Sequence, residues 1–335
     1  MIAPKSQSVE RTTSPSTDGT TRDTEGGLRF GKYHGIGNDF LVLLDLEASH
    51  PDSSDEDGAY QGGGCEIDAR LAAVLCDRHV GLGADGVIRG RLAPEGSDSV
   101  LTFELWNADG SSAEISGTGM RCLAQAALEA GIVTEDVPFG VLTPAGRKEV
   151  TLRWTGPGAV WASTEMGAAV VEGEADRCNV GHGQLLVDVG NPHLVVLGPD
   201  PTTVDVANLG PKLEATSPAG LNVEFVTLGP GPDEITMRVW ERGVGETQAC
   251  GTGSCAAAVA LHHWGRVGRE VTVHQPGGAV AVSVRPDGRV MLAGPSARVG
   301  SMTADPSLLG PVDGPGPVEA HGSVDGPGPR AGDAS

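Results

Sequence analysis

Two Gly-Thr-Gly turns hold the residues of this 335-residue sequence that are best placed to do chemistry, Ser116-Gly-Thr-Gly119 and Cys250-Gly-Thr-Gly253. Each turn precedes a stretch with helical spacing of apolar residues, so each should open a helix. The unpaired N–H groups of a helix start bind anions, and glycines let the backbone approach a ligand closely. A thiol at such a position typically has a lowered pKa, which predicts that Cys250 forms a thiolate base at neutral pH.

Two acid/base groups of this kind suit the inversion of a carbon next to a carboxylate. One group removes the weakly acidic proton, and the other returns a proton to the opposite face. The two helix starts would hold the carboxylate and stabilise the negative charge that builds up as the proton leaves. A single cysteine is more often a small buried hydrophobe, but the place of Cys250 in a sequence repeat favours a functional role.

The repeat has a spacing of 134 residues, which is the separation of Ser116 and Cys250. At this spacing Leu101-Thr-Phe-Glu-Leu-Trp106 falls on Ile235-Thr-Met-Arg-Val-Trp240, and Gly131 falls on Gly265 without a gap. The paired glycines are the expected helix stops. The sequence therefore predicts two copies of a strand–loop–helix unit, related by a pseudo-twofold axis, with both helix starts facing one cleft.

Short β-branched runs alternate with a few helical runs along the rest of the chain, which indicates a mixed α/β protein. We expect strands at Val100–Trp106, Leu185–Val189, Ile235–Trp240 and Glu270–His274, and helices at Leu71–Arg78, Met120–Glu129 and Ser254–Trp264. The polar residues 1–27, the surface loop at 50–64 and the Pro/Gly-rich residues 305–335 are expected to be disordered or irregular, because they have little apolar surface to bury.

Composition excludes several classes of protein. A net charge of −21 without a run of Lys or Arg argues against a nucleic-acid partner. The sequence contains no apolar run suited to a secretory signal or to a membrane span, so the cytoplasm is the expected compartment. The six cysteines show neither metal-ligand spacing nor the density of a disulfide scaffold, and are expected to be reduced.

Several separate strings resemble the diaminopimelate epimerase family, and the resemblance runs from about Leu28 to Gly300. The matching strings are His34-Gly-Ile-Gly-Asn-Asp-Phe40, Asn107-Ala-Asp-Gly110, Gly190-Asn-Pro-His193, Asn222, and Glu241-Arg-Gly-Val-Gly-Glu-Thr247 followed by Cys250-Gly-Thr-Gly253. These strings occur in the order that the family has.

The resemblance implies an α/β (α+β) fold of two similar pseudo-symmetric domains, each a mixed sheet wrapped around a central helix, which close on the substrate. The expected domains are residues 28–148, joined by a returning strand near 296–304, and residues 149–295. The implied protein is an isomerase of lysine biosynthesis that uses no pyridoxal phosphate, no other cofactor and no metal. Its expected partner is a small amino-acid substrate, and the resemblance allows a homodimer.

The family's site positions carry over residue by residue. Cys250 and Ser116 occupy the two catalytic positions. The resemblance implies that Asn107, Asn191, Asn222 and Arg242 hold the distal carboxylate of the substrate, that Glu241 holds the distal ammonium, that Asn38 lines the same pocket, and that backbone N–H groups of Gly117, Thr118, Gly251 and Thr252 bind the reacting carboxylate.

Ser116 is the main departure from the family pattern, because a second catalytic cysteine is expected at this position. A hydroxyl is a much weaker acid than a thiol, so proton removal on that face should be slower. Cys122 lies inside the predicted helix and is badly placed to substitute. Thr118 replaces the usual Asn, and Gly86 stands where some members carry a polar residue.

Other signals favour ordinary structural roles. Gly81-Leu-Gly-Ala-Asp-Gly86 fits a dinucleotide-binding pattern, but it follows a predicted helix and precedes a strand, the reverse of what that motif needs. The adjacent His262 and His263 point in different directions on a helix and suit no shared metal site. For His193 a cleft role and a structural role stay open, and Asp39 is expected to brace a turn.

Three functions remain open at this point. The first is interconversion of LL- and meso-diaminopimelate. The second, suggested by Ser116, is a related racemase or a one-base lyase acting on another amino acid. The third is a diaminopimelate-binding protein that has lost turnover, although the intact turn around Cys250 argues against it.

Overall fold

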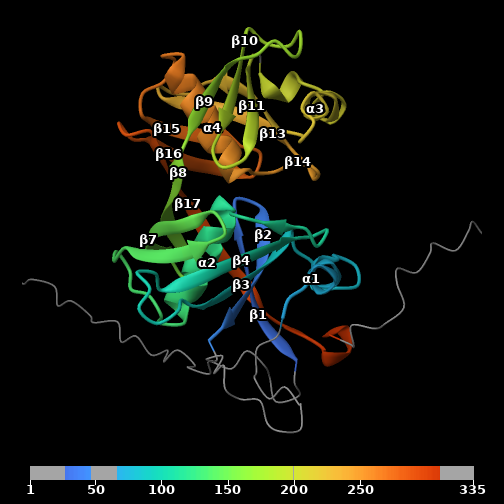
Figure 1. Cartoon of the computed structure of the whole chain (residues 1–335), viewed down its shortest axis with the longest axis vertical. Helices are drawn as coiled ribbons and strands as arrows, with labels where there is room; N and C mark the ends of the chain where they lie inside the picture. The colour runs from blue at the N-terminus through green and yellow to red at the C-terminus, as the bar shows by residue number, and fades with distance from the viewer. Residues whose placement is uncertain (1–26, 47–65, 199, 310–335) are drawn as a thin grey trace, which may run out of the picture.

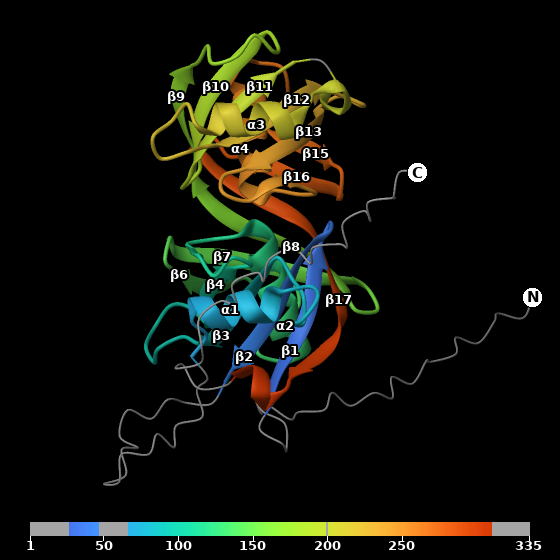
Figure 2. The same ribbon diagram turned by 90° about the vertical axis from the view of Figure 1, so that its right-hand side faces the viewer.

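The computed structural model describes residues 27–46, 66–198 and 200–309, and these residues form two lobes of similar build (Figures 1 and 2). Each lobe is a curved mixed sheet around one central helix, with a second helix on its outer surface. No helix in these ranges is long and apolar enough to cross a membrane. The loop predicted at 50–64 and nearly all of the segment predicted to be disordered at 1–27 lie outside the described residues.

The first lobe is a ring of strands in which each strand pairs with the next. Its elements are β1 (Leu28–Gly35), β2 (Asn38–Asp45), α1 (Ala69–Cys76), β3 (Gly86–Leu92), β4 (Leu101–Asn107), β5 (Ser112–Ala113), α2 (Gly117–Glu129), β6 (Phe139–Thr143), β7 (Gly146–Gly156) and β8 (Ala159–Ala168). The order of pairing is β1–β2–β3–β4–β6–β7–β8, with β2–β3 and β4–β6 parallel and the other pairs antiparallel. The last strand of the protein, β17, closes the ring by pairing with both β8 and β1.

The second lobe repeats this order of elements. It contains β10 (Gly183–Asp188), β11 (Pro192–Leu197), α3 (Val206–Glu214), β12 (Asn222–Leu228), β13 (Glu234–Glu241), β14 (Gly245–Thr247), α4 (Gly251–His263), β15 (Glu270–Gln275), β16 (Gly278–Val284) and β17 (Arg289–Ala304), with the short helix η1 (Pro201–Thr203) before α3. β11–β12 and β13–β15 are the parallel pairs, at the positions equivalent to those of the first lobe. The two-lobed, pseudo-symmetric fold predicted from the repeat is confirmed.

Two long strands join the lobes. β8 and β17 pair antiparallel from Ala159 opposite Ala297 to Ala168 opposite Arg289, with Trp161 opposite Pro295. After β8 the chain runs directly into β9 (Val170–Glu174), which pairs with β10 of the second lobe, while β17 runs on to pair with β1 of the first. Positions 161 and 295 differ by the repeat spacing, so the pseudo-twofold axis passes through this pair.

The central helices α2 and α4 are buried along nearly their whole length, and their starts meet between the lobes. A Cβ placed on Gly251 would lie 3.3 Å from the Cα of Gly117. A Cβ on Gly117 would lie 3.6 Å from the Cα of Gly251, so the two helix starts are in close contact at these glycines. The predicted stops are confirmed, because Gly131 and Gly265 have φ angles of +72° and +66°. Such angles end a helix, and glycine adopts them without steric cost.

The predicted elements differ from the observed ones mainly at their ends. α2 and α4 begin three residues earlier than predicted because the Gly-Thr-Gly turns are their first turns. α1 ends at Cys76, before the predicted Arg78, because the Asp77 carboxylate accepts the N–H groups of His79 and Val80 and starts a turn. The predicted strands all form.

The predicted domain boundary at residue 148 stays a prediction. Val150, Leu152, Val160 and Ala162 pack in the core of the first lobe, which favours a boundary further along β8. At the other end, η2 (Pro306–Leu309) occupies residues that were predicted to belong to the irregular tail, and Leu308 packs beside the core around α1. Residues 310–335 lie outside the described residues.

Candidate active site

A cavity of about 400 Å³ opens where the starts of α2 and α4 meet, and both lobes contribute to its wall. Every site residue predicted from the sequence lines it: Asn38, Asn107, Ser116, Gly117, Thr118, Asn191, Asn222, Glu241, Arg242, Cys250, Gly251 and Thr252. The repeat and the family resemblance therefore lead to one place in the fold. The role of each residue there remains a proposal.

Ser116 and Cys250 occupy equivalent positions at the two helix starts. The Ser116 Oγ accepts the N–H of Gly119 at 3.0 Å, and the Cys250 Sγ accepts the N–H of Gly253 at 3.3 Å. Each is thus the cap of its helix, held in extended backbone conformation just before the first turn. The two side chains approach the cavity from opposite lobes, as a two-face proton transfer requires.

The surroundings of Cys250 contradict one prediction. Burial raises the pKa of the thiol well above its usual value, and the carboxylates of Glu241 and Glu224 raise it further. The hydrogen bonds from Thr252 and from the Gly253 N–H favour the thiolate but do not outweigh burial. Cys250 of the free protein is therefore a protonated thiol at neutral pH, not the thiolate expected from its helix start alone.

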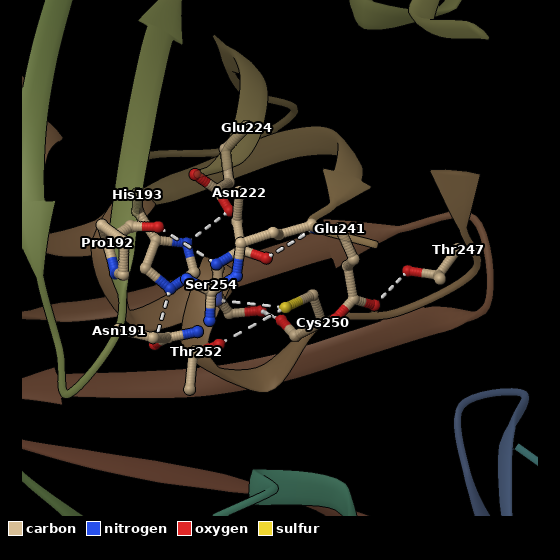
Figure 3. Close-up of polar contacts among 12 residues, drawn as sticks. Asn191, Pro192, His193, Asn222, Glu224, Glu241, Thr247, Cys250, Thr252 and Ser254 are labelled. Atoms are coloured by element: carbon tan, nitrogen blue, oxygen red, sulfur yellow. Dashed lines mark hydrogen bonds and ion pairs between the residues drawn. The ribbon is translucent and has the colours of Figure 1, made fainter. Parts of the chain in front are cut away.

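Glu241, at the end of β13, lies against this thiol (Figure 3). Its Oε1 accepts the hydroxyl of Thr247, and its carboxylate also has a side-chain hydrogen bond with Cys250. Burial raises the pKa of Glu241, so this carboxylate is a stronger base than an exposed glutamate. The Cys250–Glu241 pair can thus share one proton.

A histidine–glutamate pair is buried in the same lobe. His193 Nδ1 is 2.7 Å from Glu224 Oε1, and both side chains are fully buried. The other ring nitrogen of His193 lies 3.0 Å from Asn191 Oδ1, so the imidazole connects the buried carboxylate to a residue of the cavity wall (Figure 3). The structure places His193 behind the wall, where it orients Asn191.

Asn222 and Arg242 form the outer part of the wall in this lobe. The Asn222 amide donates to Pro192 O at 3.1 Å and accepts the N–H of Arg242 at 3.0 Å, so it braces two loops. The guanidinium of Arg242 is exposed and donates to Ala219 O at 3.1 Å. Arg242 therefore stands at the rim of the cavity, where its exposed guanidinium can meet an anionic ligand.

The first lobe orients Asn38 through a network of charges. Asp85 Oδ2 accepts the Asn38 amide at 2.9 Å, and Asp85 Oδ1 accepts the Arg78 guanidinium at 2.7 Å. Arg78 also binds Asp39, which in turn contacts Lys32. Because Asp85 takes up an amide N–H group, Asn38 can present its carbonyl oxygen to the cavity. Asp39 braces this turn, as expected.

The first lobe contributes both apolar and polar side chains to the cavity wall that contains Ser116. Phe40, Leu105, Ala113 and Ile115 line the cavity near it, and its lobe has asparagine, Asn107, where the second lobe has Glu241 at the repeat spacing. Within residues 27–46, 66–198 and 200–309, no carboxylate is hydrogen-bonded to the Ser116 hydroxyl as Glu241 is to Cys250, although Asp85 and Asp109 line the same cavity. Cys122 is a residue of α2 that is buried in the core, where burial raises its pKa to about 12, so it does not substitute.

Some contributing residues were missed from the sequence. Thr247 donates its hydroxyl to Glu241, and Asp85 accepts the amide of Asn38. Gln275 accepts the N–H of Cys250. Only Glu224 carried a local signal, since a carboxylate inside the apolar run Asn222-Val-Glu-Phe225 needs a buried partner. The strand order and the strand after α1 agree with the reading of Gly81–Gly86 as a turn and not as a nucleotide loop.

Replacing Glu241 by Gln should make Cys250 easier to alkylate. Removing the neighbouring negative charge lowers the thiol pKa, so the rate constant with iodoacetamide at pH 7 should rise roughly tenfold, the change expected for one pKa unit. Peptide mass spectrometry would follow Cys250 separately from the other cysteines. In both proteins labelling should accelerate as the pH rises, because the pKa lies above neutrality.

Glu246→Gln is the matched control, because Glu246 is a nearby carboxylate of β14 that pairs with Arg238 instead of Cys250. It should leave the labelling of Cys250 unchanged. An unchanged or slower rate in Glu241→Gln would contradict the inference that the charge of Glu241 raises the pKa of the Cys250 thiol.

Comparison with known proteins agrees with this geometry. The model of a family described as "Diaminopimelate epimerase" matches residues 30–172 and 185–299. A diaminopimelate epimerase of Synechococcus elongatus is 36% identical over 294 residues, which cover 82% of this chain and 98% of the relative. The diaminopimelate epimerase of Desulfitobacterium hafniense is 36% identical over 287 residues, covering 80% and 95%.

Solved structures with low sequence identity share the fold. A phenazine biosynthesis protein of the PhzF family from Bacillus anthracis has a TM-score of 0.61 at 14% identity and covers 83% of this chain and 99% of its own. A hydroxyproline epimerase from Agrobacterium vitis, with bound trans-4-hydroxy-L-proline, has a TM-score of 0.61 at 16% identity, covering 84% and 93%.

Proposed function

Because this chain belongs to the diaminopimelate epimerase family, we propose that it interconverts LL- and meso-diaminopimelate by removing and returning the proton at one α-carbon. Membership makes the chain an isomerase of the racemase and epimerase type. The observation that carries the specific substrate is the cavity wall, in which every position matched to the family's substrate site comes together from both lobes.

The reacting carboxylate is proposed to bind between the two helix starts. Backbone N–H groups of Gly117, Thr118, Gly251 and Thr252 are available there, and two helix dipoles point their positive ends at the same region. Donors in this position stabilise the charge that develops on the carboxylate as the α-proton leaves. The α-carbon then lies between Cys250 on one face and Ser116 on the other.

The distal end of the substrate is proposed to occupy the outer wall. Arg242 at the rim suits a carboxylate, together with the amides of Asn107, Asn191 and Asn222. The carbonyl oxygen of Asn38 suits an ammonium, and so does Glu241, whose carboxylate also contacts the catalytic thiol. Glu241 would then contact both the distal ammonium of the substrate and the thiol of Cys250.

Proton transfer starts from the protonated Cys250 of the free protein. For removal, the thiol first passes its proton to Glu241, and the resulting thiolate takes the α-proton. Ser116 returns a proton to the opposite face from its hydroxyl, and the resulting alkoxide regains a proton through solvent as Glu241 releases the one that it took from the thiol, which restores the starting state. In the reverse direction Ser116 must act as the base, and since a hydroxyl ionises much less readily than a thiol, this direction is the slower one.

A second candidate follows from Ser116 alone. With one strong acid/base group, a related enzyme would remove a proton and expel a leaving group from the neighbouring carbon, which makes a lyase of another amino acid. The hydrogen bonds of the described residues favour this alternative, because Cys250 has Glu241 as a partner that can accept its proton while the Ser116 hydroxyl is bound only to the N–H of Gly119. Elimination would give an unsaturated or keto product, which product analysis separates from a stereoisomer.

The test is α-proton exchange in D₂O, followed by NMR with LL- and meso-diaminopimelate. The proposal expects both incorporation of deuterium and formation of the other isomer. Tight binding of diaminopimelate without exchange would indicate a binding protein, and absence of both would remove diaminopimelate as the substrate.

A further inference from the structure

Arg121, one turn into α2, is a buried cation that has no carboxylate partner in residues 27–46, 66–198 and 200–309. Its exposed fraction is 1%. The guanidinium donates to three uncharged oxygens: Nη1 to Gly117 O at 3.0 Å, Nη2 to Thr118 Oγ1 at 3.3 Å, and Nε to Pro295 O at 3.3 Å. Two of these three belong to the first turn of α2, and the third belongs to the strand that joins the lobes.

Two glycines pack against the guanidinium of Arg121 and offer it no side chain. A Cβ on Gly35 would lie 3.0 Å from Arg121 Nη2, and a Cβ on Gly294 would lie 3.4 Å from its Cζ. Burial lowers the pKa of Arg121 to about 10, which still leaves the group charged at neutral pH. An isolated buried charge costs folding free energy, so we expect an anion to compensate the charge of Arg121 when a ligand occupies the cavity.

The second lobe has no equivalent charge. At the repeat spacing Arg121 corresponds to Cys255, a buried and uncharged residue of α4. The two helix starts nevertheless meet at Gly117 and Gly251, so one cation behind the first of them lies close to both. A single guanidinium can therefore act on an anion held between the two starts.

We propose that Arg121 is the positioning residue of the carboxylate site: it fixes the first turn of α2 against β17, and the ligand carboxylate is its counter-ion. This inference rests on the proposed function only in identifying that carboxylate with the one of the substrate. The contacts to Gly117 O and Thr118 Oγ1 set the direction of the N–H groups that face the cavity. The contact to Pro295 O ties this turn to the pseudo-twofold axis.

The test uses two alkylating agents of nearly equal size, anionic iodoacetate and neutral iodoacetamide, and follows modification of Cys250 in the full chain by peptide mass spectrometry. A carboxylate site at the helix starts should favour iodoacetate. In Arg121→Gln the ratio of the two rate constants should fall about tenfold, equal to roughly 1.4 kcal/mol. A ratio that stays at the natural value overturns the proposal.

Arg121→Lys covers the case in which Arg121→Gln does not fold. A lysine keeps the charge but cannot span three acceptors, so the ratio should fall by an intermediate factor, about threefold. An unchanged ratio in Arg121→Lys also overturns the positioning role. The double variant Asp45→Asn with Arg89→Gln is the matched control, because it removes a buried arginine together with its carboxylate and should leave the ratio unchanged.

This assay requires no turnover, so it is independent of the proposed reaction. If the natural protein prefers iodoacetate and loses that preference with Arg121, the carboxylate site stands even if diaminopimelate is not exchanged. If the α-proton of diaminopimelate is exchanged but replacing Arg121 does not change the ratio of the two rate constants, the proposed function stands and this inference fails.

Discussion

Replacing Cys250 by Ser is expected to lower the rate of α-proton exchange about a thousandfold. A positioned general acid/base contributes roughly 10²- to 10⁴-fold to such a reaction. The variant would have a hydroxyl on both faces, and neither hydroxyl ionises to a useful extent at neutral pH. Burial and Glu241 already oppose ionisation of the natural thiol, so the weaker acid would be affected even more strongly.

Exchange in D₂O with both isomers of diaminopimelate measures this effect. Cys178→Ser is the control, since Cys178 is a partly exposed cysteine that contacts Val180 O outside the cavity. It should retain the natural rate. If Cys250→Ser kept more than about a tenth of the natural exchange rate, Cys250 would not be the principal base.

Replacing Ser116 by Cys is expected to raise the rate of inversion about a hundredfold. The thiol should fit, because Cys250 already occupies the equivalent cap position with its sulfur on the third N–H of the helix. The variant gains a group that ionises readily on the slow face. In the natural protein, deuterium should enter one isomer faster than inversion occurs, and in the variant the two rates should become similar.

Ser116→Ala separates the two explanations for slow inversion. If the serine hydroxyl returns the proton, Ser116→Ala should exchange but no longer invert. If Ser116→Ala inverts as well as the natural protein does, the proton on that face comes from elsewhere and Ser116 is only a helix cap. If Ser116→Cys inverts diaminopimelate no faster than the natural protein does, the result would support the single-base lyase or the binding protein.

The fold could be predicted to the extent that the repeat reports it. Trp106 and Trp240, the two helix caps and the stops at Gly131 and Gly265 all obey one spacing, and local rules assign strand, turn and helix to them. The resemblance implied a strand near 296–304 that returns to the first domain, but the pairing of β8 with β17 between the lobes could not be predicted, because both strands look locally like any other alternating run. Their pairing joins residues far apart in the sequence.

The residues that line the cavity could be predicted from the sequence, but the pKa of Cys250 could not. The family strings named Asn38, Cys250 and Glu241, which line one cavity, and their roles there stay predictions. The pKa of Cys250 was predicted in the wrong direction, because the local rule sees the helix start while the dominant effect is burial beneath β12 and β13. Arg121 gave no signal, since an arginine inside a helix is usually solvated.

The pairing of β8 and β17 between the lobes affects how this protein unfolds. Neither ring is complete without a strand whose other end belongs to the opposite lobe, so removing either lobe leaves an open sheet edge in the other. Open edges of this kind invite pairing with other chains. The loss of order in one lobe must therefore spread through β8 and β17 to the other, and the two similar halves unfold as one cooperative unit.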